Sequence, residues 1–551
     1  MPMPYQELLI LLPCHSLEDF PTYHEGDDAD GLLSAWSAMW HPAFLASAGT
    51  KPGWCRVDSP PVELAQRLLI VPTVAQQQLP TGFAQRAKDA GACLVRRLHK
   101  RDDIVAAALA GLGPDAPAID ADLAADFMAL GYCYLEVQLL TRQMRYASNL
   151  DELHFQNLVV AGARAARDGD LVLAREKLQA CFDMLAEERN HYYPVEAYLL
   201  DVILAAPTTV GASLRTELAT DSPASLLING SCLEQMSARE PETMTAVCGA
   251  IQADRLSLIG GEAEERRWPL LGHESILAEL RRGGTLFERL VGARPAIYGR
   301  RRFGLTPALP QILSRLGFRG ALHATLDDGR FPQGSQLKVR WEGGDGTGID
   351  AVARPPLDAS KPQTFLSLAM KLGESMDSDH VATLMLAHWP GQASPWLDVL
   401  RRVAKYSPAM GRFVSFEKYF RDTDPPGQID RFEVDQYRSP YLKQAIIRRQ
   451  VDPISSSVRY WRRRALLESL TAYDTLLTLA GGPAPVADSE EQRQRAAWAE
   501  QTDQRPEDAE PDLATAEAFD AELAAAAQRG AERLAAALPH SKSAAGPGYL
   551  L

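Results

Sequence analysis

Three consecutive arginines, Arg300 to Arg302, occupy a short turn at which reacting groups are expected. The residues before them, ARPAIY, predict a strand, because β-branched and aromatic residues follow an Arg-Pro that can open a strand. The residues after them predict a helix that begins at Thr306 and Pro307 and ends at Gly317. Strand, polar turn and helix form the unit in which an α/β barrel exposes its reacting groups, at the carboxyl end of the strand.

A second candidate set follows the first predicted strand, residues 5–14. Within 27 residues the chain places nine ionisable side chains, enough for a metal or an acid–base pair: His15, Glu18, Asp19, His24, Glu25, Asp27, Asp28, Asp30 and His41. Two interpretations stay open. Either Asp27 or Asp28 caps a helix and the others are solvated, or the loop holds a rebuilt site at the active end of a barrel strand.

Two further predicted strand ends carry polar or aromatic side chains. His388 and Trp389 suit a sugar platform, because an indole face stacks on the apolar side of a pyranose; a packed Trp is the alternative. Glu262, Glu264 and Glu265 are either spare carboxylates of a site or a solvated loop. The signatures G-x-S-x-G, P-loop, G-x-G-x-x-G after a strand and H-E-x-x-H do not occur in the sequence.

The arginine stretch resembles the nucleophile motif of the glycoside hydrolase family 38 α-mannosidases. The matching residues are Phe303, Gly304, Pro310, Ile312, Leu313, Gly317 and Phe318. Three key positions differ: the motif's Trp is Tyr298, the His after Phe-Gly is Leu305, and the nucleophilic Asp is Arg301. Over about residues 210–480 the family's glycine pair, acidic helix start and W-x-G-x-D-G hairpin also agree, at Gly260, Gly261, Glu274, Ser275, Trp341, Gly343, Asp345 and Gly346.

The resemblance implies a zinc ion and a pair of carboxylates, and the chain departs from both. The family's four zinc-ligand positions fall on Leu17, Asp19, Arg301 and Val451. One Asp cannot hold zinc, so we predict no metal and no other cofactor. The acid/base position of the family falls on Asp358. Because an unpaired buried charge costs several kcal/mol, Arg301 is predicted to pair with Asp19 and also with Asp358.

The order of strand and helix patterns predicts an α/β fold, and the resemblance implies its type: a seven-stranded βα barrel of the glycoside hydrolase/deacetylase type. A helical insertion interrupts this barrel, and a helical bundle follows it. The expected parts are the first βα units (1–101), the helical insertion (102–206), the rest of the barrel (207–425), the helical middle domain (426–545) and the start of a missing β-sandwich region (546–551). Residues 482–512 have no apolar period and are expected to form a linker.

Composition narrows the class of protein. The 551 residues are 46% hydrophobic and 23% charged, as in an ordinary globular protein, and too many for one compact core. The net charge of −14 argues against a nucleic-acid partner. Seven scattered cysteines and an apolar amino-terminal run too short for a signal peptide favour a cytoplasmic location, and no apolar run is long enough for a membrane partner. Whether the chain forms a homo-oligomer stays open.

Two functions follow from these observations. The first is a carbohydrate-binding pseudo-enzyme that keeps the barrel, binds sugar through Tyr298, His388 and Trp389, and has Arg301 in place of the nucleophile. The second is an active glycoside hydrolase for α-mannoside-like substrates, whose rebuilt catalytic site would use His15, Glu18, Asp19 and Asp358. The replaced ligands and nucleophile favour the first, and whether the protein is an enzyme stays open.

Overall fold

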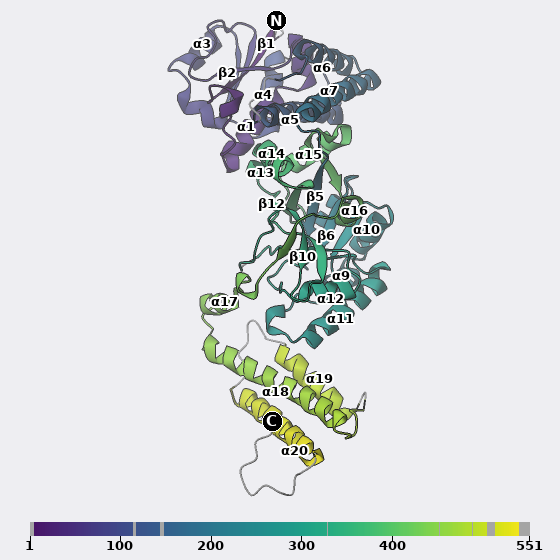
Figure 1. Ribbon diagram of the computed structural model, residues 1–551. Helices are drawn as coiled ribbons and strands as arrows, with labels where there is room; N and C mark the ends of the chain where they lie inside the picture. The colour runs from purple at the N-terminus through teal and green to yellow at the C-terminus, as the bar shows by residue number, and fades with distance from the viewer. Residues whose placement is uncertain are drawn as a thin grey trace. The chain divides into compact units, whose positions relative to one another are not determined.

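The protein is an α/β protein with two sheets that divides into two compact units (Figure 1). The computed structural model describes residues 5–113, 117–143, 148–327, 329–450, 452–486, 489–503 and 513–538. Unit 1 consists of Met1–Glu265, Leu280–Asp327 and Phe331–Tyr437. Unit 2 consists of Arg266–Glu279, Asp328–Arg330 and Arg438–Leu551.

The amino-terminal part of unit 1 contains a parallel four-stranded sheet in the order β2-β1-β3-β4. The strands are β1 (Glu7–Leu12), β2 (Gly53–Arg56), β3 (Arg67–Val71) and β4 (Cys93–Arg96). The accompanying helices are α1 (Gly26–Ala38), α2 (Pro42–Ala48), α3 (Phe83–Asp89) and α4 (Arg101–Leu112). Both faces of β1 are buried, because Leu8 and Ile10 pack in one apolar cluster and Leu9 and Leu11 in another.

This sheet corrects the expectation that residues 1–101 supply the first strands of the barrel. β1 hydrogen-bonds only to β2 and β3 among the described strands, and the eleven-stranded main sheet contains neither β1 nor its neighbours. A strand buried on both faces is a continuous apolar run in any parallel sheet. The run from Glu7 to Leu12 therefore could not reveal to which sheet it belongs.

Helices occupy most of the stretch predicted as an insertion. They are α4, α5 (Ala121–Gln143), α6 (Glu152–Arg167) and α7 (Leu171–Tyr192). The expected boundary at residue 206 is too late, since strand β5 already begins at Ala197. Within α5, the stretch Ala121–Arg142 is the one described helix long and apolar enough to cross a membrane, but 94% of its 18-residue apolar window is buried inside the protein. Buried core helices can have the same length and composition as membrane spans, and the burial of α5 shows that it is a core helix.

Glu136 is a carboxyl group fully buried in α5, and it gives a testable pH dependence. Its Oε2 accepts a hydrogen bond from the Ala369 N–H at 2.8 Å, whereas Oε1 has no partner. Burial raises the pKa of Glu136 well above 4.5, so the folded state loses stability as pH rises above that value. Glu136→Gln should unfold like the wild type near pH 4, and should be more stable by roughly 1–3 kcal/mol at pH 8 in urea titrations. An equal shift at both pH values would contradict this assignment.

The main sheet of unit 1 has the order β12-β13-β5-β6-β7-β8-β9-β11-β10-β15, and β14 also pairs with β5. From β13 to β11 its strands are parallel: β13 (Ala382–His388), β5 (Ala197–Leu204), β6 (Ala224–Leu227), β7 (Leu256–Gly260), β8 (Ile297–Tyr298), β9 (Gly320–Leu322) and β11 (Gly348–Val352). The remaining strands are β10 (Lys338–Glu342), β12 (Leu357–Asp358), β14 (Arg412–Val414) and β15 (Ile429–Arg431).

Alternate residues of these strands face two different cores. One apolar cluster takes a residue from every parallel strand, among them Val202, Leu227, Ile259, Ile297, Leu322, Val352 and Met385. The opposite faces of β5 to β7 pack in a second cluster with helices α9 (Gly230–Arg239) and α10 (Pro241–Gln252). This alternation separates an inner face of the sheet from an outer, helix-covered face.

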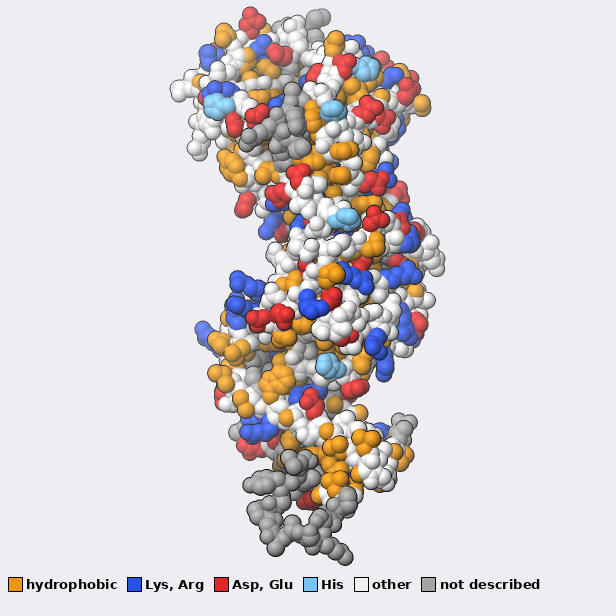
Figure 2. Space-filling view, viewed as in Figure 1, with side chains coloured by type: hydrophobic (Ala, Val, Ile, Leu, Met, Phe, Trp, Pro, Cys, Tyr) orange, Lys and Arg blue, Asp and Glu red, His pale blue; other side chains and the backbone are white. Residues whose placement is uncertain are grey.

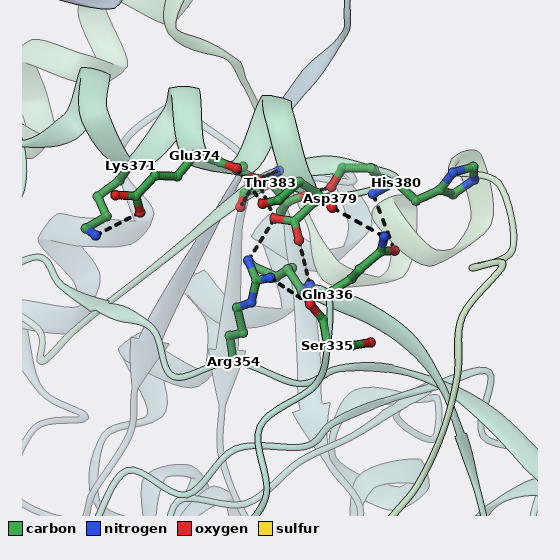
Figure 3. Close-up of polar contacts among 12 residues, drawn as sticks. Ser335, Gln336, Arg354, Lys371, Glu374, Asp379, His380 and Thr383 are labelled. Atoms are coloured by element: carbon green, nitrogen blue, oxygen red, sulfur yellow. Dashed lines mark hydrogen bonds and ion pairs between the residues drawn. The ribbon is translucent and has the colours of Figure 1, made fainter. Parts of the chain in front are cut away.

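The two ends of the parallel run are joined by one short segment and by a polar cluster. β11, at one end, is followed after four residues by β12, which pairs with β13 at the other end. Asp379, just before β13, is buried and accepts hydrogen bonds from the Leu337 N–H at 3.0 Å and from Arg354 at 2.9 Å. Figure 3 shows Gln336 beside this cluster, where its side chain bonds the backbone of Ser378 and His380.

Unit 2 is mainly helical. Its helices from Arg438 onward are α17 (Tyr441–Ile447), α18 (Pro453–Leu479), α19 (Glu490–Asp503) and α20 (Leu513–Ala537), and Figure 1 shows α19 and α20 beside α18. Leu467, Leu470, Trp498, Phe519 and Leu523 form their shared core. The linker expected over residues 482–512 is wrong in part, because α19 lies within it and Trp498 anchors that helix. The β-sandwich start expected at 546–551 lies outside the described residues.

Candidate site at the carboxyl ends of β7, β8 and β9

Two carboxylates hold the arginine turn that follows β8. The Glu265 carboxylate accepts hydrogen bonds from the backbone N–H groups of Arg301 at 3.0 Å and Arg302 at 3.1 Å. The Asp327 Oδ1 accepts the next N–H, that of Phe303, at 3.0 Å. Successive N–H groups in a turn form an anion-binding concavity, and here the chain's own carboxylates, from the ends of β7 and β9, fill it.

Arg300, the first arginine of this turn, is buried in an ion pair with Glu262. Its guanidinium Nη1 lies 3.1 Å and 3.2 Å from the two carboxylate oxygens, and neither side chain is more than 2% exposed. The Tyr298 hydroxyl donates to the same carboxylate at 2.8 Å. Burial and the Glu262 charge raise the pKa of Tyr298 well above 10, so Tyr298 stays a neutral donor. Tyr298 is therefore part of a buried network, away from the solvent-facing side of the turn.

The glycine pair before Glu262 makes this packing possible. A Cβ on Gly260 would lie 2.3 Å from the Ile228 carbonyl oxygen, and Gly261 has a φ of +137°, which L side chains rarely adopt. Only glycine lets the chain leave β7 so close to β6 and turn Glu262 toward Arg300.

Arg301 points its guanidinium at Trp389. The guanidinium carbon lies 5.3 Å from the centre of the indole ring, within the range of a cation–π contact. Both side chains are half-buried, and Trp389 packs against the inner apolar cluster. Among the described residues, the Arg301 guanidinium forms no hydrogen bond or ion pair, so its N–H donors are available to a ligand.

Asp327 has the perturbed carboxyl group of this site. Burial raises its pKa above 3.8, and the nearby Glu265 charge adds to the shift. Its hydrogen bonds from the Phe303 N–H and the Thr325 hydroxyl act in the opposite direction without cancelling the effect. A carboxyl group with a raised pKa at a strand end is a candidate proton donor.

His388 lies on the outer face of the main sheet and does not form a sugar platform with Trp389. Its Nε2 is 3.1 Å from the Asp201 carboxylate, and both side chains are fully buried. Arg401, from helix α15 (Pro395–Tyr406), bonds the other Asp201 oxygen at 2.8 Å and lies 3.4 Å from Glu217. Burial opposes ionisation of both partners and is the largest single cause. Their mutual hydrogen bond and charge attraction, with Arg401 beside Asp201 and Glu217 near His388, together outweigh it, so the pKa of Asp201 is lowered and that of His388 raised.

The structure does not bring the predicted acidic residues of the first loop to this turn. His15, Glu18 and Asp19 are exposed, the latter two in a short 3-10 helix, Leu17–Asp19, whose Leu17 side chain is buried in the amino-terminal core. The predicted pairing of Arg301 with Asp19 and Asp358 is wrong, since the Arg301 guanidinium contacts the Trp389 ring instead.

The remaining predicted residues have local roles. Asp358 accepts hydrogen bonds from Ser360, and despite partial burial these bonds lower its pKa below 3.8. In the first loop, Asp30 accepts the Trp396 indole N–H at 2.7 Å, and the His41 side chain caps α2. The helix cap predicted at Asp27 or Asp28 is wrong, because both residues lie in the first turn of α1, whose N-cap residue Glu25 makes no side-chain cap hydrogen bond. Both side chains are exposed to solvent.

A zinc ion does not fit the residues that the resemblance assigns to it. Leu17 and Asp19 belong to the amino-terminal part and Arg301 to the turn after β8, while Val451 lies outside the described residues. Within the described part of the chain, no three His, Cys, Asp or Glu side chains are grouped closely enough to hold a metal ion. An aliphatic side chain and a guanidinium offer zinc no donor.

Comparison with known proteins finds distant structural neighbours. No family model and no curated protein matches the chain. An α-mannosidase from Enterococcus faecalis is similar with a TM-score of 0.40 and 14% identity, over 62% of this chain and 43% of that one. A 4-α-glucanotransferase from Thermococcus litoralis is similar with a TM-score of 0.37 and 12% identity, and the match covers 56% of this chain and 55% of that one. A GH57-type branching enzyme from Pyrococcus horikoshii is similar with a TM-score of 0.36 and 9% identity, and the match covers 62% of this chain and 88% of that one.

These neighbours are carbohydrate-active enzymes, and the chain spans less than two thirds of the first two. At such scores and identities, the function has to be inferred from the residues of the site. Sequence reasoning noted Glu262 and Glu265 but missed Asp327 and Asp201. Asp327 could have been found as the first carboxylate after the strand-like GALHATL, whereas Asp201 sits inside an apolar strand where nothing in the sequence pattern indicates its partners.

Proposed function

We propose that this protein is a carbohydrate-binding protein on a barrel related to that of the family 38 α-mannosidases, without zinc-dependent catalysis. The observation that supports it most is the Arg301–Trp389 pair at the carboxyl ends of β8 and β13. An indole face packs against a pyranose, and a guanidinium without an ion pair donates to its hydroxyl oxygens. In our proposal the same surface takes α-mannoside-like sugars, in a cytoplasmic protein.

The barrel is part of this proposal, and two observations support it. Three strands separate β13 from β8, so in a flat sheet their ends would lie about 19 Å apart, yet Trp389 and Arg301 are in contact. In addition, β11 and β12 behave as two halves of one strand, broken at Pro355-Pro356. The first half pairs with β9 and the second with β13. With this composite strand the parallel run has seven members and returns to its start.

Our proposal includes the loss of catalysis, and the state of two carboxylates supports it. Glu262 is paired with Arg300, and Glu265 is bound by two backbone N–H groups. A retaining hydrolase needs one free carboxylate as nucleophile and a second as acid, about 5–5.5 Å away. The position that the resemblance assigns to the nucleophile carries Arg301, which cannot attack a sugar.

Glycan binding tests the proposal. We expect the purified protein to bind mannose-containing oligosaccharides on an array. Arg301→Met should weaken this binding about ten- to hundredfold, because a hydrogen bond to a charged group contributes about 1.5–3 kcal/mol. Trp389→Leu should have a similar effect in calorimetric titrations. Arg315→Met, which changes an exposed arginine of the next helix, is the matched control. Failure to bind any oligosaccharide, or binding unchanged in both variants, would refute the proposal.

A second candidate function is hydrolysis with Asp327 as acid and Glu265 as its partner, and the raised pKa of Asp327 favours it. The same proteins decide between the two. Cleavage of an aryl α-mannoside that disappears in Asp327→Asn and persists in Asp19→Ala would establish the hydrolase. Binding without cleavage would leave the first function.

A further inference from the structure

The segment that enters the helical part of unit 2 has a charge opposite to that of the whole chain. Residues 438–464 contain eight Lys or Arg side chains and a single acidic one, Asp452, in a chain of net charge −14. Within unit 2, Arg459 and Arg463 contact Asp520, and Arg464 lies near Glu468. Lys443, Arg448, Arg449 and Arg462 are exposed to solvent.

The same segment exposes large apolar side chains. Six of them are between 47% and 65% exposed: Leu442, Ile446, Ile447, Ile454, Val458 and Trp461. Figure 2 shows hydrophobic side chains gathered over α17, with basic side chains nearby. Scattered exposed apolar residues are normal, but six within 20 residues of sequence mark an interaction surface.

On α18 the exposed apolar residues form one stripe. Ile454, Val458 and Trp461 are spaced i, i+4 and i+7, so they share a face of the helix. The opposite face packs inward, with Tyr460 and Leu467 buried at 5% and 8% exposure. The helix is thus apolar on both sides, one covered by unit 2 and the other open to solvent, with Arg462 at the edge of the open side.

We propose that the surface formed by these apolar and basic side chains of α17 and α18 binds the face of an anionic phospholipid bilayer. Aliphatic and Trp side chains flanked by Lys and Arg are the composition of helices that lie in the interfacial region of a membrane. Clusters of four or more basic side chains add attraction to anionic headgroups. This proposal departs from the expectation, made from the sequence, that the protein has no membrane partner.

Charge also argues against the other occupants of this surface. A two-fold dimer through this face would bring two copies of Lys443, Arg448, Arg449 and Arg462 into one interface, where like charges repel. A nucleic acid would neutralise the charges but leave the apolar stripe in water. A bilayer interface satisfies both, since acyl chains cover the stripe while phosphates meet the guanidinium groups.

Vesicle flotation with the full chain tests the proposal. We expect the protein to float with vesicles that contain roughly 30 mol% phosphatidylserine in phosphatidylcholine, and to stay unbound with phosphatidylcholine alone. Reversing three charges, Arg448→Glu, Arg449→Glu and Arg462→Glu, should lower the partition coefficient at least about 100-fold at ~0.1 M salt. Removing the stripe with Val458→Asp and Trp461→Ala should reduce it similarly, and circular dichroism should verify that the variants remain folded.

Matched controls use sites in unit 1. Lys88→Glu reverses an exposed charge, and Val62→Asp replaces a residue that is 91% exposed; neither should change the partition coefficient. Equal binding to neutral and anionic vesicles, no binding to either, or variants that bind like the wild type would overturn the proposal. A concentration-dependent dimer in sedimentation velocity, lost in the stripe variant, would overturn it in favour of a contact between copies. None of these outcomes depends on glycan binding.

Discussion

Replacing Arg300 by leucine should lower the free energy of unfolding by about 3–5 kcal/mol, the usual cost of breaking a buried ion pair by removing one member. Arg300 and Glu262 are almost completely buried, and the guanidinium also bonds the Arg302 carbonyl at 2.8 Å. Without Arg300, Glu262 would lose this ion pair, while its hydrogen bond from the Tyr298 hydroxyl would remain. Urea unfolding of the full chain, followed by circular dichroism, measures the loss.

A double substitution separates charge from packing. Glu262→Leu combined with Arg300→Leu removes both charges, and should recover a large part of the stability lost in Arg300→Leu. Arg319→Leu is the control, because Arg319 is 64% exposed and its ion pair with Glu417 should contribute no more than about 1 kcal/mol. If Arg300→Leu unfolds like Arg319→Leu, the buried pair does not hold the turn.

The Asp201–His388 pair should make the stability of unit 1 depend on pH in a defined window. The pKa of His388 is raised above 6.5, so its contribution is complete below pH 6.5 and is lost as pH rises through the folded-state value. The pKa of Asp201 is lowered below 3.8, so its contribution is present above pH 3.8 and is lost as pH falls through its folded-state value. The pair therefore stabilises most between about pH 4 and pH 6.5.

His388→Gln and Asp201→Asn test this window. Asp201→Asn should cost about 3–5 kcal/mol at pH 5.5, because Arg401 and His388⁺ lose their buried partner and keep only the Glu217 and Asp398 carboxylates near Arg401. His388→Gln should abolish the decline in stability from pH 6.5 to pH 8.5. His380→Gln, at an exposed histidine, should leave the decline unchanged. A wild-type decline that survives in His388→Gln would show that another group titrates.

The sequence was most informative where a strand ends in a distinctive turn. The strand before Arg300 and a helix after Thr306 are present as β8 and α12 (Leu309–Arg315), although the helix is shorter than its cap pattern predicted. The sequence was least informative about which strands pair with one another. Whether Glu7–Leu12 lies in the main sheet depends on packing with helices far along the chain, and an apolar run is the same in either sheet.

The candidate site could be located but not assembled from the sequence. Arg301 and Trp389 were each placed at a strand end, yet nothing in the sequence predicted that they touch, because three other strands separate β8 from β13. The expected charge partner was wrong for a related reason. Asp19 was expected beside Arg301 because the strand before it was assigned to the barrel. That strand, β1, lies in the four-stranded sheet instead, so Asp19 is not near the turn. Tyr298 and His388 were expected to bind sugar, but both side chains are buried in polar networks. The residue type alone does not indicate whether a Tyr or His is buried.

The composite strand of β11 and β12 has a consequence for the order of folding. It joins β9 to β13 through four residues, while β13 must also find β5, whose first residue lies 185 positions earlier in the chain. Loop closure over such a separation is slow, so in our proposal the ring closes late, by the pairing of β13 with β5. Native fluctuations should then open the ring first between these two strands, exposing the inner cluster without unfolding the other strands.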